Sequence, residues 1–230
     1  MSGIGILNEK PLHASLKEWY SQPGDQFEVK VNGFEIDIVR DDMLIEIQTG
    51  NFSSIKSKLQ KLVPFYRLTL VYPIALEKWI VKSSMDSDTD VTRRKSPKKG
   101  RIEDLYGEIV SIPYLLTNPN FSLDVLLIHE EELRYYDGKR NWRRRGWVTQ
   151  EHRLLEVIGR KRIEAARDLL SFIPADLGET FTTKELAETM GICRNLAQKM
   201  AYCLRKMDLI ELVGKRERSN LYEMVDTKDL

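Results

Sequence analysis

The segment from Phe34 to Thr49 constrains the fold of this chain more than any other. Six of its apolar residues recur at the period of two that is typical of a strand with one buried face: Phe34, Ile36, Ile38, Met43, Ile45 and Ile47. The acidic pair at residues 41–42 falls midway and predicts a reversal of the chain. We therefore predict a β-hairpin over residues 34–49 that buries these six side chains on one face.

The predicted hairpin also brings acidic side chains together. A turn at residues 41–42 sets Asp37 opposite Glu46 and Glu35 opposite Gln48. Like charges that face each other across a strand pair destabilise a sheet. A divalent cation removes this repulsion, because hard metal ions prefer carboxylate oxygens. Asp37 and Glu46 therefore form a candidate metal site, and the alternative is an edge ribbon whose solvated charges block aggregation.

Length and composition bound the class of protein. With 230 residues, of which 42% are hydrophobic, the chain can bury one large core and a smaller one. It has no run of 18 apolar residues and no basic N-terminal region followed by an apolar stretch, so we expect neither a membrane span nor a secretory signal. Cys193 and Cys203 match neither a disulfide framework nor a zinc site, and we expect both to be core thiols. These features predict a cytoplasmic protein of two domains.

The net charge of +1 conceals two basic segments. Residues 93–150 carry 12 Lys and Arg against 8 Asp and Glu, concentrated in residues 93–101 and 139–147. Such segments contact nucleic-acid phosphates or remain solvated charge runs, and the tryptophans of the second segment stack on bases or pack in the core. The candidate DNA contacts here are Arg93, Arg94, Lys95, Lys98, Lys99, Arg143, Arg144 and Arg145.

The order of elements predicts an α/β fold for the first part of the chain. We expect a helix at 8–20, a strand at 27–31, the hairpin at 34–49, a helix at 55–63 and strands at 68–72 and 79–81. This order predicts a mixed sheet between helices. Beyond it we expect a loop or basic arm at residues 83–101 and a helix at 102–116 that is broken near a proline. Two short strands should follow within residues 122–136. The first domain then covers residues 1–148.

Residues 149–230 follow a different pattern. We expect a long helix at 152–172, a capped short helix ending at Gly191, a helix at 192–207 and strands at 209–213 and 221–225. Two helices around a glycine turn, followed by a hairpin, are typical of a winged helix-turn-helix. Its candidate DNA contacts are Arg194, Asn195, Gln198, Lys199, Lys215, Arg216 and Arg218. Because this domain has no net charge, a protein-interaction winged helix is the alternative.

The first domain resembles the core of the PD-(D/E)XK nuclease superfamily, which has the restriction-endonuclease-like fold. In that superfamily an Asp on one strand and an acid-x-Lys triplet on the next line one edge of a sheet, and a preceding helix often adds a Glu. The matching residues within 8–75 are Asp37, Glu46-Ile47-Gln48 and Glu9. The resemblance implies Mg²⁺ or Mn²⁺ held by Asp37, Glu46, the carbonyl of Ile47 and Glu9, with Gln48 orienting the attacking water.

Gln48 departs from the pattern, because the superfamily usually has lysine there to stabilise developing negative charge. Either a lysine from elsewhere reaches the site, with Lys30, Lys56 and Lys58 as candidates, or the protein has lost cleavage and keeps the fold for binding. The first explanation predicts a metal-dependent endonuclease that a winged helix targets to duplex or branched DNA. The second predicts an inactive DNA-binding or regulatory protein, and an RNA-processing factor is a third class.

The domain order is similar to that of the endonuclease subunit of certain heteromeric transposases. This is a similarity of layout and not of matched motifs. Separately, we expect a nucleoid-associated protein that forms a homodimer or belongs to a larger recombination, repair or defence complex.

Overall fold

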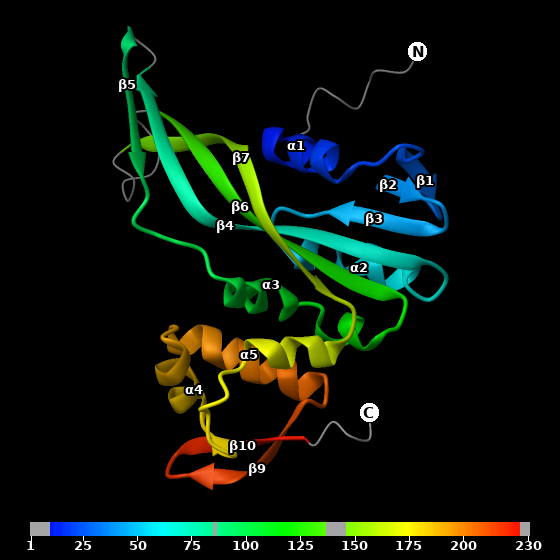
Figure 1. Ribbon diagram of the computed structural model, residues 1–230, viewed down its shortest axis with the longest axis vertical. Helices are drawn as coiled ribbons and strands as arrows, with labels where there is room; N and C mark the ends of the chain where they lie inside the picture. Colours follow the sequence, from blue (N-terminus) through cyan, green and yellow to red (C-terminus); the bar gives the residue numbers. More distant parts are fainter. Residues whose placement is uncertain (1–9, 85–86, 137–145, 226–230) are drawn as a thin grey trace.

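The computed structural model describes residues 10–84, 87–136 and 146–225. They form a mixed α/β fold: a seven-stranded sheet with helices, followed by a small three-stranded antiparallel sheet with two helices (Figure 1). The large sheet has the order β1-β2-β3-β4-β6-β7, and β5 pairs with the far half of β4. Its strands are β1 (Gln26–Val31), β2 (Phe34–Arg40), β3 (Met43–Ile47), β4 (Arg67–Ser84), β5 (Ser87–Lys95), β6 (Phe121–Tyr136) and β7 (Trp147–Ile163).

The predicted hairpin is confirmed in its register. Arg40 pairs with Met43 and Ile38 with Ile45, so that residues 41–42 form a two-residue turn. The single buried face is wrong, because Ile36 packs in the cluster on the opposite face of the sheet from Ile38. The alternation is interrupted at Asp37, next to Glu28 of β1, whose φ of 54° breaks the extended conformation.

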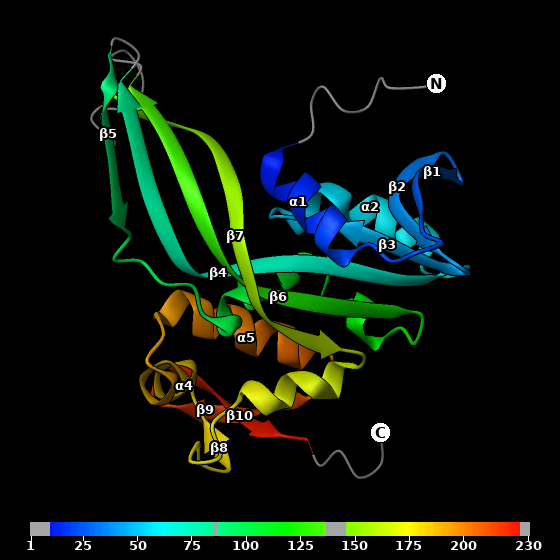
Figure 2. The same cartoon turned by 45° about the horizontal axis from the view of Figure 1, so that its top comes forward.

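Two helices lie beside the hairpin (Figure 2), and they pack in different core clusters, one on each face of the sheet. On one face, α1 (Pro11–Tyr20) buries Leu12 and Leu16 against Ile38, Ile45 and other strand residues. On the other face, α2 (Phe52–Leu62) buries Phe52, Leu59 and Leu62. Strands β3 and β4 are parallel, as are β4 and β6, which is typical of a sheet that is buried on both sides.

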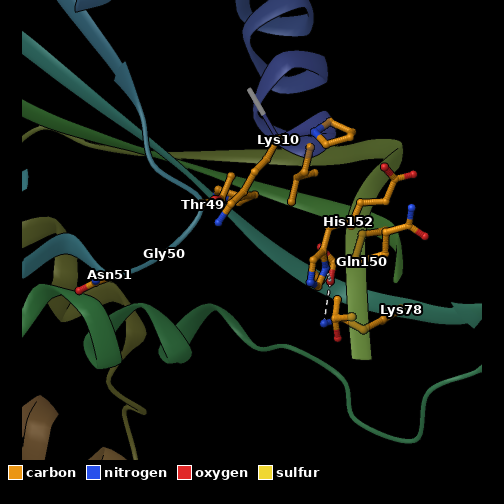
Figure 3. Close-up of a pocket in the computed structure, with 14 residues that line it drawn as sticks. Lys10, Thr49, Gly50, Asn51, Lys78, Gln150 and His152 are labelled. Atoms are coloured by element: carbon orange, nitrogen blue, oxygen red, sulfur yellow. Dashed lines mark hydrogen bonds and ion pairs between the residues drawn. The ribbon is translucent and has the colours of Figure 1, made fainter. Parts of the chain in front are cut away.

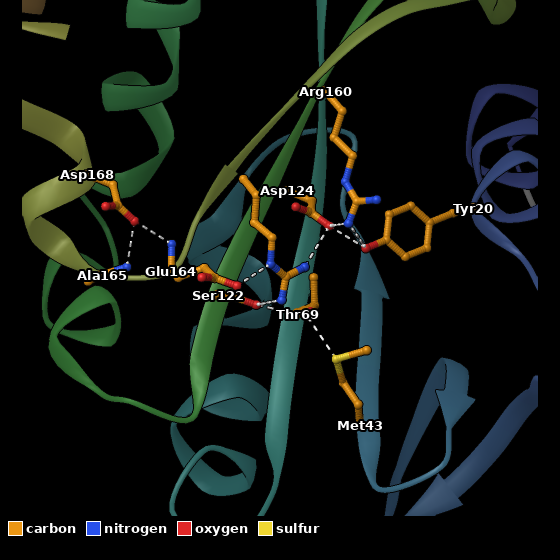
Figure 4. Close-up of polar contacts among 10 residues, drawn as sticks. Tyr20, Met43, Thr69, Ser122, Asp124, Arg160, Glu164, Ala165 and Asp168 are labelled. Carbon is orange, nitrogen blue, oxygen red and sulfur yellow. Dashed lines mark hydrogen bonds and ion pairs between the residues drawn. The ribbon is translucent and has the colours of Figure 1, made fainter. Parts of the chain in front are cut away.

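A buried polar cluster fixes the C-terminal end of α1 to the sheet (Figure 4). Asp124 of β6 is fully buried and accepts hydrogen bonds from the Tyr20 hydroxyl and from Arg160 and Arg162 of β7. A buried carboxylate is tolerated only where donors and opposite charges compensate it. The cluster therefore holds α1, and with it the side chain of His13, in a defined position over β3.

The long strands β4, β6 and β7 continue beyond the helices and bend away from the body of the protein, and β5 pairs with β4 there (Figure 1). We call this part the arm; it comprises residues 78–84, 87–95, 130–136 and 147–153. The expected loop at 83–101 is thus partly wrong, because residues 87–95 pair with β4 as a strand. The two short strands expected within 122–136 are one continuous strand, β6, and those expected at 68–72 and 79–81 are both part of β4.

The long helix expected at 152–172 is also wrong. Residues 147–163 form β7, antiparallel to β6, and only Ala166–Phe172 is helical, as a short 3₁₀ helix. The sheet therefore extends to Ile163, beyond the boundary predicted at residue 148. The broken helix expected at 102–116 is present as three short pieces: a 3₁₀ helix at Ile102–Leu105, α3 (Tyr106–Ile109) and a 3₁₀ helix at Pro113–Thr117.

The C-terminal elements follow the prediction from α4 onward. They are β8 (Thr180–Phe181), α4 (Thr183–Met190), α5 (Arg194–Lys206), β9 (Ile210–Arg216) and β10 (Ser219–Met224). Thr182 and Glu185 form a capping box at the start of α4, and Gly191 ends it with a φ of 61°. Cys203 is buried as expected, whereas Cys193 is exposed. Among the helices of the described residues, none is long and apolar enough to cross a membrane.

The C-terminal elements pack directly on the large sheet and its helices. Met200, Cys203 and Leu204 of α5 share one core cluster with Tyr106 and Ile109 of α3. Arg101 donates hydrogen bonds across the boundary to the carbonyls of Met190 (2.9 Å) and Gly191 (3.0 Å). The two parts are therefore joined by a continuous apolar core and by a charged side chain that caps the C-terminal end of α4.

Candidate active site

Asp37 and Glu46 lie where β2 and β3 separate. The ladder between the two strands ends at the pair of Ile38 and Ile45, and the two acids follow one residue beyond it. There the backbone N–H of Ile47 donates to the Asp37 carboxylate (2.7 Å) instead of to a carbonyl of β2. A strand residue directs its N–H and its C=O to the same side, so the Ile47 carbonyl also faces the opening beside Asp37.

Two basic side chains reach these acids from the helices. Lys58 of α2 forms an ion pair with Glu46 and donates a hydrogen bond to the carbonyl of Glu35. On α1, Nε2 of His13 lies 3.3 Å from a carboxylate oxygen of Asp37. The Glu46 side chain is only 6% exposed and that of Asp37 is 21% exposed. The site thus holds an unusually buried carboxylate between a lysine and a second acid.

The surroundings move the pKa values of the two acids apart. Burial raises the pKa of Glu46 to about 7, and the charge of Asp37 adds to this effect against the opposing influence of Lys58. Burial also acts to raise the pKa of Asp37, but hydrogen bonds from His13 and from the Ile47 N–H outweigh it and hold that pKa below its ordinary value. Two neighbouring carboxyl groups with separated pKa values are typical of acid–base and metal sites.

Gln48 follows Glu46 by two residues but points along the loop between β3 and α2. Its backbone N–H donates to the carbonyl of Val71 (2.9 Å), and its side-chain amide donates to the carbonyls of Gly50 and Asn51. The amide therefore fixes the loop that leads into α2. Of the lysines considered as replacements, Lys58 reaches the acids, whereas Lys30 and Lys56 are exposed on β1 and α2.

Two further acids, Glu9 and Glu35, were considered for the site from the sequence. Glu9 lies outside the described residues. Glu35 is exposed, and it contributes its carbonyl to Lys58. His13 was not predicted, because it follows Leu12 on α1 without a spacing that indicates a ligand; only the packing of α1 across β3 brings it to Asp37.

Two adjoining cavities open beside these residues. A cavity of about 430 Å³ is lined by His13, Gln48 and Ser54, among others. A second cavity, of about 610 Å³, shares Lys10, Thr49, Gly50 and Asn51 with it and extends to the arm (Figure 3). In Figure 3, Lys10 and Thr49 face Gln150 and His152 across this space. The hollow at the base of the arm therefore adjoins the candidate site through His13 and Gln48, whereas Asp37 and Glu46 are not among the residues that line these two cavities.

Comparison with known proteins shows the family of this chain. The family described as "Domain of unknown function (DUF8091)" matches residues 10–164, which is more than half of the chain. The chain belongs to the DUF8091 family. An "Uncharacterized protein" of Treponema pallidum (strain Nichols) is 30% identical over 221 residues, covering 95% of this chain and 86% of that protein. No solved structure matches the chain.

The DUF8091 match ends one residue after β7, so it contains the whole large sheet, the arm and the candidate site. The Treponema relative extends the similarity over the C-terminal elements as well. The unit defined by the family is therefore the complete sheet up to Ile163, which agrees with the structure rather than with a boundary at residue 148.

The DUF8091 domain offers a small ligand set for a metal ion. Among the described residues, no group of three His, Cys, Asp or Glu side chains converges to hold one. The available oxygens are the carboxylates of Asp37 and Glu46 and the carbonyl of Ile47. Oε1 of Glu46 is buried, and its contact in the described part of the chain is the ion pair with Lys58. This set suits Mg²⁺, which commonly binds through one or two carboxylates and keeps several waters.

The predicted DNA contacts of the arm differ in whether they form ion pairs with acidic residues of the protein. Arg93 pairs with Glu131 (2.8 Å) and Lys95 pairs with Glu77, and both cations lie over the ring of Trp79. The other three basic residues of this stretch are exposed: Arg94, Lys98 and Lys99. Arg143, Arg144 and Arg145 lie outside the described residues.

The predicted contacts of the C-terminal elements lie mainly on the surface. Arg194, Asn195 and Gln198 are exposed on α5, and Lys199 beside them is half-buried. Lys215 and Arg218 are exposed at the hairpin of β9 and β10. Arg216 instead forms an ion pair with Glu185 of α4, so its guanidinium fixes the hairpin to that helix.

Proposed function

We propose that this protein is a metal-dependent endonuclease that hydrolyses phosphodiester bonds of DNA. The observation that carries the proposal is Glu46: a buried carboxyl group beside a second acid, placed where two strands separate and contacted by a lysine from another element. Burying an under-compensated carboxylate costs stability, so such an arrangement indicates a functional constraint.

The order of the elements supports the finer assignment. Helix α1, the three strands β1, β2 and β3, helix α2 and the parallel strand β4 follow the order of the PD-(D/E)XK core, with Asp37 on the second strand and Glu46 on the third. The restriction-endonuclease-like fold is therefore our interpretation of the large sheet. In this interpretation the arm is an addition to that core.

The residues of the site have separate roles in the proposed reaction. Asp37, Glu46 and the carbonyl of Ile47 would hold Mg²⁺ or Mn²⁺, with Glu9 as a further candidate ligand. Such an ion, when bound, polarises the phosphate and lowers the pKa of a water. Lys58 supplies the positive charge that Gln48 lacks, next to the place where negative charge develops. His13 keeps Asp37 ionised, and Gln48 fixes the loop that borders the cavity.

The C-terminal elements would dock the DNA. Helices α4 and α5 with the hairpin of β9 and β10 have the arrangement of a winged helix-turn-helix, in which the second helix enters the major groove. Arg194, Asn195 and Gln198 would then face base edges and phosphates from the exposed side of α5. Lys215 and Arg218 would contact phosphates from the wing.

A non-catalytic DNA-binding or regulatory role is the second candidate. It is favoured by Gln48, whose side-chain amide is engaged by loop carbonyls, and by the small number of ligating side chains at Asp37 and Glu46. In this case the buried Glu46 would be retained from a catalytic ancestor and paired with Lys58.

Cleavage of supercoiled plasmid separates the two candidates. We expect the protein to nick plasmid with Mg²⁺ or Mn²⁺, and we expect Asp37→Asn and Glu46→Gln to reduce the rate at least about 10³-fold, since each removes a charge that the reaction needs. Glu35→Gln is the matched control, because Glu35 is an exposed acid on the same strand as Asp37. Tight DNA binding without nicking in either metal would establish the non-catalytic role, and an RNA oligonucleotide tested in parallel would identify the RNA-processing class.

A further inference from the structure

The hollow beside the candidate site continues along the arm as a single groove. Its first two cavities share Lys10 and the loop of residues 49–51, and a third cavity of about 590 Å³ shares Pro73, Ala75 and Lys78 with the second. The groove therefore begins at His13 and Gln48, passes Lys78 and reaches Lys98 and Arg134. It passes the edge of β4 at residues 72–78, because its third cavity is also lined by Tyr72 and Ile74, which pack on the face of the sheet that α2 covers.

The groove has an apolar floor and charged rims. Pro73 and Ala75 of β4, with Leu12 of α1, provide apolar surface in its middle section. Lys10 is exposed at one end and Lys98 at the other, and neither ammonium group pairs with a carboxylate in the part of the chain that the structure describes. Each is therefore available to bind an anion.

Buried acids hold the other basic side chains of the groove in place. Glu130 of β6 is 2.7 Å from Lys78 and 3.2 Å from His152, and Glu132 accepts a hydrogen bond from Arg134 (2.9 Å). Both glutamates are buried below the surface of the arm. These contacts fix the positions of Lys78 and Arg134 along the groove, while the two glutamates offset their charge and leave Lys10 and Lys98 as the cations available to a phosphate.

The dimensions of the groove suit one strand of nucleic acid. Each section has the volume of a small-ligand pocket, and the groove is enclosed by α1 and the loop of residues 49–51 on one side and by β7 on the other (Figure 3). Proteins bind single strands by combining basic side chains for phosphates with aromatic side chains on which bases stack. The groove offers Lys10 and Lys98 for phosphates and the ring of Tyr72 for a base, beside the carboxylates of Glu151 and Asp104. A duplex would require an open face instead.

We propose that this groove binds an unpaired tail of the substrate, which runs from the candidate active site along β4 toward Lys98. The inference rests on the proposed function and names the substrate class: DNA in which a single-stranded extension adjoins a duplex. The tail passes Lys10 first and Lys98 last, so the two lysines report on different lengths of tail.

Binding of fluorescent oligonucleotides to the full chain without metal tests this proposal. One duplex is used blunt, with a two-nucleotide tail and with an eight-nucleotide tail. We expect the long tail to tighten binding about tenfold, because it reaches the third cavity and stacking of one base on a ring such as that of Tyr72 has an effect of that size. Lys10→Glu should reduce the gain from both tails, whereas Lys98→Glu should reduce the gain from the long tail alone. Lys61→Glu, an exposed cation at the far end of α2, is the matched control and should change blunt and tailed affinities equally.

Equal affinity for blunt and tailed duplexes would overturn the proposal, and so would a gain from the long tail that Lys98→Glu leaves intact. Either result would leave the endonuclease proposal standing if plasmid is still nicked. Conversely, tail-dependent binding in a protein that nicks nothing would refute the nuclease and support the groove.

Discussion

Two pairs of neighbouring acids on the same sheet are compensated to different extents. In the arm, Glu130 and Glu132 are each 5% exposed, and together they contact Lys78, His152, Arg134 and Thr149. At the candidate site, Glu46 is equally buried, but its single basic contact is offset by the charge of Asp37. The sheet therefore carries one charge network that is satisfied and one that is not.

The pKa values express this difference directly. Burial acts to raise the pKa of Glu132, but hydrogen bonds from Arg134 and Thr149 outweigh it and lower that pKa to about 2. Burial dominates for Glu46 and raises its pKa to about 7. A carboxyl group that the fold compensates is part of the structure, whereas one that the fold leaves under-compensated indicates a ligand or a reaction.

Removal of Lys58 should have the largest effect. If Lys58 replaces the lysine missing at position 48, Lys58→Met should reduce the single-turnover nicking rate about 10²- to 10³-fold, as loss of an electrostatic stabiliser does elsewhere. Lys56→Met, which changes an exposed lysine on the same helix, should retain the wild-type rate, with circular dichroism as a check of folding in both. Equal rates for the two variants would mean that Lys58 merely neutralises Glu46.

Removal of Glu132 should have the next largest effect, on stability. Glu132→Ala leaves Arg134 beside an apolar gap and should lower the free energy of unfolding by about 3 kcal/mol, measured by urea denaturation at pH 7. Glu131→Ala is the control, because its partner Arg93 is half exposed. Because the folded pKa of Glu132 is depressed, the wild type should lose this stabilisation as the pH falls from about 4.5 toward 2, whereas the variant should not. A cost below 1 kcal/mol would show that the arm network is not compensated.

Replacement of Glu46 should change stability in the opposite direction. The pKa of Glu46 is raised to about 7 in the folded protein, so the folded state binds the proton of Glu46 more tightly than the unfolded state does. The resulting stabilisation is fully present below pH 4.5 and is lost as the pH rises to about 7. Glu46→Gln carries no such loss and should be more stable than wild type by about 1–2 kcal/mol at pH 8 without metal, and about equal to it at pH 4.5. Parallel denaturation curves at the two pH values would contradict the under-compensated state of Glu46.

Local patterns in the sequence predicted the parts of the molecule that are built from neighbouring residues. The register of the hairpin follows from alternation and the turn at residues 41–42, and α4 and α5 follow from the cap at Thr182 and the turn at Gly191. These signals are local because the interacting groups are a few residues apart. The same reasoning placed Asp37 beside Glu46 and included Lys58 among three candidate lysines.

The strands of the arm were predicted poorly, although part of their pairing is local. Strand β5 follows β4, with Ser87 opposite Ser84, and β7 follows β6, with Trp147 opposite Tyr136. With charged residues on both faces of the arm, neither β5 nor β7 shows the alternation that indicates a half-buried sheet. His13 was missed for a different reason: its partner is distant in the sequence, and only the packing of α1 brings it to Asp37.

The smallest expected effect concerns two adjacent arginines of the arm, which repeat the contrast between compensated and free charges. Arg93 is paired with Glu131 and lies over Trp79, whereas Arg94 is exposed and has no acidic partner among the described residues. If the arm contacts DNA, Arg94→Ala should reduce the slope of log affinity against log salt concentration by about one, with a loss of a few-fold in affinity. Arg93→Ala should leave the slope unchanged, because Glu131 already neutralises its charge. Equal slopes for wild type and both variants, measured by fluorescence anisotropy on one duplex, would assign this strand of the arm to structure rather than to DNA binding.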